Sequence, residues 1–379
     1  MLKKNIISMN STLEKFIPKY YDVGVNITDS MFNGNYHGKI HHQNDIIQVL
    51  KKAFKHHVND VLLTGSSLSE SNKTIEIIQS LKNEINLPNL YSTVGIHPCA
   101  VLEFENASIS VDDHLFKLEN LINKGIKLNI IRAFGEIGLD YDRLNFTPID
   151  KQLIYFEKQL NLATKFNLPL FLHMRTACDD FIKILKPFLE KNLLINKNLL
   201  IHSFTGNKLE LEKLLNLNGF NNYNIYISLN GASLRDNSTL DIIHLIPLNR
   251  LMIETDSPWC EIKKSHPSYK YLEKSPNIFY PCDYENYNNI GNDVKEILNS
   301  NTKKNLNLSL HEFLPIPIVK SDKFDSFKYK SFFEDTPLIK NRNEPCLIGL
   351  VAQVISKITK QNPQLIIESA YNNSRQVFG

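Results

Sequence analysis

Four apolar stretches of the sequence each end on a side chain that can bind a metal ion. These ends are occupied by Glu136, His173, His202 and Asp256. Carboxylate oxygens and imidazole nitrogens suit Mg²⁺, Mn²⁺ or Zn²⁺, and the set needs no thiolate. A carboxylate such as Glu136 can bridge two ions, and such a pair can hold a phosphate while it activates a water molecule. The set therefore predicts a hydrolytic site with one or two divalent ions, with Mg²⁺ as the first choice.

A further acid, Glu254, precedes Asp256 by two residues. Alternate residues of a strand point to the same face, so both carboxylates are expected on one side. One of them would bind the metal ion while the other orients or deprotonates the attacking water. We therefore expect catalysis to depend on Asp256, Glu254 and Glu136.

Candidate contacts to a phosphate group lie near the same strand ends. Arg175 lies just past one of the histidines, and Arg143 lies in the loop after the glutamate. A guanidinium group can make paired hydrogen bonds with phosphate oxygens. His97 ends another strand and can donate a hydrogen bond to a phosphate. Asn26 ends the first strand, where it can contact the site or cap a turn.

Eight apolar stretches separated by helical patterns must position these side chains. Apolar runs bounded by glycine, proline or polar residues predict strands over 20–26, 60–65, 91–96, 129–140, 169–173, 198–202, 223–229 and 250–256. Apolar residues recur at helical spacing between them, as over 45–55 and 112–124. This alternation predicts an α/β protein with a (β/α)8 TIM barrel. A doubly wound open sheet is the rival, but only a closed barrel brings the ends of strands four, five, six and eight to one axis.

Two segments fall outside this alternation. Residues 1–19 form a polar N-terminal tail before the barrel domain at 20–379. Residues 265–340 are rich in Asn, Lys, Tyr and Ser and lack a sustained period, which predicts a partly disordered loop insertion after strand eight. Two apolar helical stretches after residue 344 then complete the outer layer.

The bulk composition limits the classes of protein that fit. With 43 basic and 40 acidic residues the net charge is +3, so contact with nucleic acid must be local. The five cysteines form no Cys-x-x-Cys pair, and no apolar run reaches the length of a membrane helix. We expect a cytoplasmic protein with reduced thiols, no membrane contact and no obligate protein partner. Nuclear residence, secretion and organellar import stay open as alternatives.

Seven motifs resemble those of the TatD family of metal-dependent deoxyribonucleases, most closely its eukaryotic TatD-like branch. They follow the family order from about residue 20 onward and are specific when taken together. The motifs are DVGVNITD (22–29), TVGIHP (93–98), GEIGLDYDR (135–143), FLHMR (171–175), IHSF (201–204), MIETDSPW (252–259) and RNEPC (342–346).

The resemblance implies a TIM barrel that hydrolyses DNA phosphodiester bonds with divalent metal, as an exonuclease, an endonuclease or both. DNA would then be the substrate, and DNA repair or degradation the setting. In the family, the metal ligands are the residues that match Glu136, His173, His202 and Asp256.

Two features depart from the pattern that the resemblance implies. The wider superfamily has a His-x-His pair on strand one, where this sequence has Gly24 and Asn26. The TatD branch shares this loss, which leaves a second ion with fewer ligands. The insertion at 265–340 is also longer than the family usually carries, and loops after barrel strands control access to the site.

Two other functions are compatible with parts of the pattern. The same metal centre would serve hydrolysis of a small amide or ester. A non-catalytic barrel could instead use the long insertion to dock a partner, but the intact set of ligand types argues against this reading. Cleavage of labelled DNA with and without EDTA separates the three.

Overall fold

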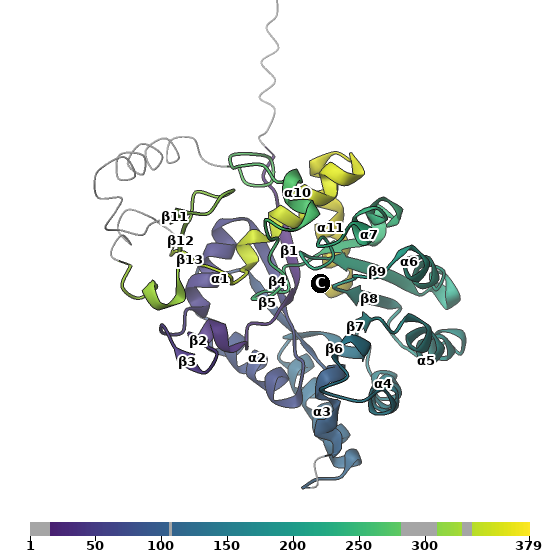
Figure 1. Ribbon diagram of the computed structural model, residues 1–379. Helices are drawn as coiled ribbons and strands as arrows, with labels where there is room; N and C mark the ends of the chain where they lie inside the picture. Colours follow the sequence, from purple (N-terminus) through teal and green to yellow (C-terminus); the bar gives the residue numbers. More distant parts are fainter. Residues whose placement is uncertain (1–15, 106–107, 282–308, 328–335) are drawn as a thin grey trace, which may run out of the picture.

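Eight parallel strands form a closed barrel at the centre of the protein (Figure 1). The computed structural model describes residues 16–105, 108–281, 309–327 and 336–379. The strand order is β1-β4-β5-β6-β7-β8-β9-β10. Main-chain hydrogen bonds join the two edges, since the N–H of Asp256 donates to Gly24 (2.9 Å) and the N–H of Asn26 to Ser257 (2.8 Å). The predicted TIM barrel is confirmed, and the open sheet is excluded.

Strands and helices alternate along the chain, and the helices pack outside the barrel (Figure 1). The barrel strands are β1 (Tyr20–Val25), β4 (Val58–Leu63), β5 (Asn89–Val94), β6 (Ile131–Asp140), β7 (Leu170–Arg175), β8 (Asn198–His202), β9 (Asn224–Leu229) and β10 (Leu251–Ile253). Among the described residues, the α-helices are α1 (Ile46–Lys55), α2 (Leu68–Ser80), α3 (Val111–Lys127), α4 (Ile149–Ala163), α5 (Cys178–Glu190), α6 (Lys208–Leu215), α7 (Asn237–Leu240), α10 (Ile348–Thr359) and α11 (Pro363–Phe378). A two-stranded hairpin, β2 (Asn35–Tyr36) and β3 (Lys39–Ile40), follows β1.

Alternation along the strands separates an apolar layer inside the barrel from a polar layer next to it. Phe171 of β7 and Leu200 of β8 belong to the buried inner cluster. His173 and His202 follow them by two residues on the same strands. Because residues i and i+2 of a strand face the same side, both histidines also point into the barrel, nearer to its C-terminal end. The ring of His202 stacks on Phe171 with centroids 4.5 Å apart, so the apolar layer supports the polar one.

The C-terminal helix covers the other end of the barrel. Val377 and Phe378 of α11 join the inner apolar cluster, and the ring of Phe378 lies 6.2 Å from that of Tyr21 at the start of β1. The hydroxyl of Tyr371 donates to Asp60 of β4 over 3.0 Å. These contacts leave the C-terminal ends of the strands as the open mouth.

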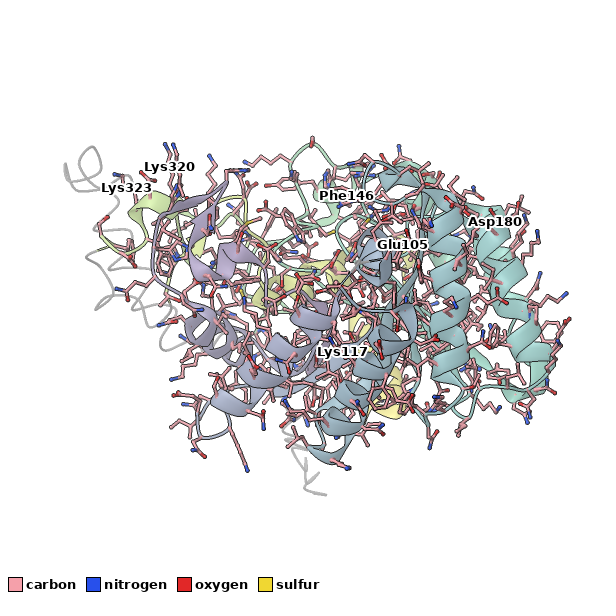
Figure 2. All side chains as sticks on the ribbon, turned by 90° about the horizontal axis from the view of Figure 1, so that it is seen from below. Glu105, Lys117, Phe146, Asp180, Lys320 and Lys323 are labelled. Carbon is pink, nitrogen blue, oxygen red and sulfur yellow. The ribbon has the colours of Figure 1, made fainter. Side chains whose placement is uncertain are left out.

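The insertion lies beside α1 at the mouth end. Figure 2 places its Lys320 and Lys323 at the upper left, at the same end as Phe146 after β6 and Asp180 of α5. Its described parts include a sheet of β11 (Ser309–Leu310), β12 (Pro317–Val319) and β13 (Leu338–Ile339). The sequence does not predict this sheet, because strands of two or three residues are too short to show alternation.

Parts of the predicted insertion, at 282–308 and 328–335, and most of the predicted N-terminal tail, at 1–15, lie outside the described residues. The cysteines within the described ranges are Cys99, Cys178, Cys260 and Cys346, and no disulfide joins any two of them. Among the helices described, none combines the length and the apolarity needed to cross a bilayer.

Candidate metal centre

Three imidazole rings converge on one carboxylate oxygen at the mouth of the barrel. Oε1 of Glu136 lies 2.6 Å from Nε2 of His202, 2.8 Å from Nδ1 of His173 and 3.4 Å from Nε2 of His97. The facing nitrogens of His173 and His202 are 3.4 Å apart. Glu136, His173 and His202 are all buried. The middle of β6 and the ends of β7 and β8 thus bring three of the four predicted ligands to one point.

Burial and opposite charge together set the protonation of this cluster. Burial opposes the charged form of Glu136, but His202, His97 and the hydrogen bonds of the site outweigh it and hold the pKa of Glu136 well below its usual value. Burial also opposes protonation of His202, yet the charges of Glu136 and Glu254 raise its pKa well above the usual value. The cluster therefore attracts positive charge, which either protons or a metal cation can supply.

The backbone decides which nitrogen of His97 carries hydrogen. The main-chain N–H of Cys99 donates to Nδ1 of His97 over 3.0 Å, so Nδ1 keeps its lone pair. Burial lowers the pKa of His97 to about 3, and the ring is neutral. Its hydrogen then lies on Nε2, the nitrogen that faces Glu136. Although His97 is close enough to be counted among possible ligands, it presents a donor to the cavity rather than a lone pair.

Asp140, at the end of β6, also belongs to the cluster. Its Oδ2 lies 3.0 Å from Nε2 of His173, on the opposite side of that ring from Glu136. Its Oδ1 accepts from the main-chain N–H of Asp142 over 3.0 Å, which fixes the carboxylate. Sequence reasoning missed Asp140. The signal that points to it is its even spacing of four residues from Glu136 on one strand.

Glu254 lies behind His202 and does not line the cavity. Its carboxylate accepts from Ser228 Oγ at 2.7 Å and from Asn230 Nδ2 at 2.9 Å. Its Oε1 is 3.4 Å from Nδ1 of His202, an ion-pair distance rather than a well-formed hydrogen bond. A carboxylate at Nδ1 favours the hydrogen on that nitrogen and leaves Nε2 to face the cavity. A side chain on Gly24 would crowd this carboxylate, because its Cβ would lie 3.1 Å from Oε2.

The expected strand geometry of Glu254 and Asp256 is wrong. β10 ends at Ile253, and Asp256 has a left-handed backbone with φ 54°, so the two acids are not alternate residues of one strand. Asp256 still lines the cavity, where its Oδ1 accepts from Nδ2 of Asn26 (2.7 Å) and its Oδ2 from Sγ of Cys260 (3.1 Å). Burial and the charge of Glu254 raise the pKa of Asp256 to about 6.

The loop that carries Asp256 is held by a segment that follows the insertion. Asn343 donates through Nδ2 to the carbonyl of Thr255 and through its main-chain N–H to the carbonyl of Pro258, both over 2.9 Å. Its neighbour Arg342 is buried and makes a bidentate pair, at 2.9 and 2.6 Å, with the aspartate that precedes α1. These bonds fix the loop before any substrate arrives, which explains the place of the RNEPC motif in the fold.

A cavity of about 440 Å³ opens over the cluster. Its lining includes the predicted phosphate contacts Arg175 and Arg143, as well as His97 and Asn26. The arrangement has carboxylates and imidazoles together with guanidinium groups, which suits an anionic substrate bound over a cation. A larger cavity of about 670 Å³ lies between the 255–260 loop and the insertion, and its lining contains none of the predicted ligands.

The donor set fits a divalent metal ion. A carboxylate oxygen of Glu136 and nitrogens of His173 and His202 meet at distances of 2.6 to 3.4 Å. Asp140 contacts the other nitrogen of His173 over 3.0 Å. Two imidazole nitrogens this close need a proton or a cation between them and the carboxylate. Oxygen and nitrogen donors without thiolate are the ligands of Mg²⁺, Mn²⁺ and Zn²⁺. The group could therefore hold a divalent ion.

Comparison with known proteins agrees with this geometry. The sequence pattern of the family described as TatD related DNase matches residues 21–313. Deoxyribonuclease Tat-D of Saccharomyces cerevisiae is 34% identical, over 98% of this chain and 94% of that protein. The 3'-5' ssDNA/RNA exonuclease TatD of Erwinia tasmaniensis is 31% identical, over 63% of this chain and 80% of its own length. The crystal structure of an uncharacterized amidohydrolase from Saccharomyces cerevisiae superposes with a TM-score of 0.77 at 34% identity, covering 96% of this chain and 100% of that one. The chain belongs to the TatD-related DNase family.

Proposed function

We propose that this protein is a divalent-metal-dependent deoxyribonuclease that hydrolyses DNA phosphodiester bonds. The observation that carries the proposal is the approach of His202 and His173 to one oxygen of Glu136, at 2.6 and 2.8 Å, beneath a cavity that also contains two arginines. The names of the relatives, deoxyribonuclease and ssDNA/RNA exonuclease, support the choice of substrate. Mg²⁺ is the proposed ion, with Mn²⁺ or Zn²⁺ as alternatives.

The proposed ligands divide between two walls of the cavity. Glu136, His173 and His202 would hold the ion from β6, β7 and β8, and Asp256 from the loop after β10. Asp140 would orient the ring of His173 from its other nitrogen, or add an oxygen to the site. A divalent ion bound here would neutralise phosphate charge and make water a stronger nucleophile.

The remaining side chains would bind the phosphodiester group itself. His97 can donate from Nε2–H to a phosphate oxygen, since its tautomer is fixed by the backbone. Arg175 and Arg143 can donate to further oxygens and offset the charge that builds in the transition state. Asn26 donates to Asp256 and keeps that carboxylate turned toward the cavity.

Removal of metal ions should abolish DNA cleavage. The full-length protein is incubated with end-labelled DNA and Mg²⁺ or Mn²⁺, and the products are separated on a denaturing gel. Excess EDTA should stop the reaction, and renewed Mg²⁺ should restore it. Cleavage that resists EDTA would contradict the metal-dependent mechanism. A metal-loaded protein that leaves DNA intact but hydrolyses a small amide or ester would favour the alternative substrate class.

We expect Glu254→Gln to weaken metal binding and cleavage together. The carboxylate faces His202 and not the cavity, so we assign it a positioning role in which it acts through the imidazole. Loss of such a partner lowers metal affinity or activity by about 10- to 100-fold. Calorimetric titration with Mn²⁺ and DNA cleavage kinetics on the same preparation measure both effects. An unchanged metal affinity with a reduced kcat would instead show that Glu254 acts on the attacking water.

A further inference from the structure

Trp259 stands in the wall of the metal-centre cavity with half of its surface exposed. It is the only tryptophan in the sequence, and its residue surface is 51% exposed. It lines the same cavity as Glu136 and Arg143. Within the described part of the chain, no aromatic ring or cationic group covers its indole. An open indole face in a polar cavity is available for an apolar, flat partner.

The backbone beneath the ring is fixed. The main-chain N–H of Trp259 donates to the carbonyl of Asp256 over 3.0 Å, and the carbonyl of Pro258 accepts from Asn343 over 2.9 Å. The backbone that carries the indole is therefore held next to a proposed metal ligand by bonds on both sides. A loop that is already ordered loses little backbone entropy when a ligand packs on it, which favours binding.

Trp259 and the arginine side of the cavity come from opposite parts of the barrel. Arg143 follows β6 and Trp259 follows β10, and these strands are four positions apart in the closed eight-stranded order. A phosphate held over Glu136 would thus have guanidinium groups on one side and an indole ring on the other. A nucleotide is complementary to this arrangement, because its phosphate carries the negative charge that guanidinium groups bind and its base has a flat face that an indole can stack on.

Resting on the proposed nuclease function, we propose that Trp259 stacks on a nucleobase next to the phosphate that is cleaved. Both faces of a base inside a duplex are covered by its neighbours, so the indole can stack only on an unpaired base or on the outer face of a terminal pair. The protein then takes a single strand or a duplex end as substrate. Because every base has a π face, this contact selects for strand state and not for sequence.

Fluorescence of the single tryptophan tests the contact without turnover. The full chain in EDTA is titrated with a single-stranded oligonucleotide, with an abasic strand of equal length and with a relaxed, covalently closed circular duplex, which has no terminal pair. Stacking predicts saturable quenching by the base-bearing single strand and little change with the other two. Equal responses to the base-bearing and abasic strands, or no response, would overturn the proposal.

Cleavage kinetics provide a second, independent readout. With metal present, Trp259→Ala should lower kcat/KM on single-stranded DNA by about tenfold or more, and the preference for base-bearing over abasic strands should disappear. Trp259→Phe should keep most of that preference, because a phenyl ring also stacks. Phe116→Ala removes a 62% exposed ring from α3, on the outside of the barrel, and as the matched control should behave as wild type.

The two proposals fail in different ways. If Trp259→Ala keeps the wild-type preference for base-bearing strands, the stacking role is overturned while the nuclease function stands. If the wild-type protein with metal cleaves no DNA at all, the proposed nuclease function is overturned, and the titration in EDTA still decides whether the indole meets a base.

Discussion

Glu136→Gln should lower kcat/KM on DNA by about 10³-fold or more with the fold intact. The amide keeps the size of the side chain but removes the charged oxygen on which three imidazole nitrogens converge. His202→Ala should have an effect of similar size, because either change removes a coordination position and displaces the attacking water. Since ligands of one ion act as a unit, the double variant should be little worse than either single variant.

A buried histidine outside the barrel provides the matched control. His114 of α3 is buried, and its Nε2 lies 3.0 Å from a carboxylate oxygen of Glu103, a contact like those of the site. His114→Ala should therefore leave kcat/KM unchanged even if it costs some stability. Steady-state kinetics in saturating Mg²⁺ and thermal unfolding are measured for all variants. Metal-dependent cleavage that survives in Glu136→Gln and His202→Ala would remove both residues from the proposed ligand set.

The barrel could be predicted from the sequence because its strands carry a local signal. Runs such as residues 169–173 and 198–202 are apolar, short and bounded by polar residues, and each of these two ends on a histidine. Strands buried on both faces produce this pattern without any knowledge of the partners. The convergence of His173 and His202 then followed from topology, since parallel strands of a barrel finish at one end.

Other parts of the site depend on contacts that a sequence does not encode locally. The direction of Asp256 depends on a left-handed residue just after β10, which breaks the expected alternation with Glu254. The hydrogen on Nε2 of His97 is decided by one main-chain N–H two residues away. The hydrogen bond from Asn343 to the carbonyl of Thr255 joins residues 88 positions apart. Such contacts become visible only once the chain is folded.

The small sheet of the insertion illustrates a different limit. β11, β12 and β13 have two or three residues each, so no periodic pattern can develop along them. They are held by packing instead, with Phe313, Leu314 and Ile316 buried nearby. Composition alone therefore predicts a loop where the described residues form a sheet beside the mouth of the barrel.

Arg175→Ala should separate substrate binding from metal binding. Arg175 ends β7, two residues after His173, and lines the cavity as the strand alternation predicts. A guanidinium group has donors only, so it can hold a phosphate oxygen but cannot ligate a cation. We expect kcat/KM on DNA to fall by about 10²-fold or more, the effect of removing one preorganised donor. Metal affinity should change little, although Arg175 adds to the contact with His173 in lowering the pKa of Asp140 against the opposing effect of burial.

The substituted residue and its position both matter for this prediction. Arg175→Lys should recover only part of the activity. The compact ammonium group of lysine replaces a planar guanidinium group that can donate to two oxygens at once. Arg250→Ala is the matched control, since Arg250 directly precedes β10 at the closed end of the barrel and bonds to Asn224. Calorimetric Mn²⁺ titration and cleavage kinetics are run on the same preparations. A loss of metal affinity in Arg175→Ala would mean that the guanidinium orients a ligand. Unchanged cleavage would mean that it does not reach the phosphate, and the contact would then be sought at Arg143 and His97.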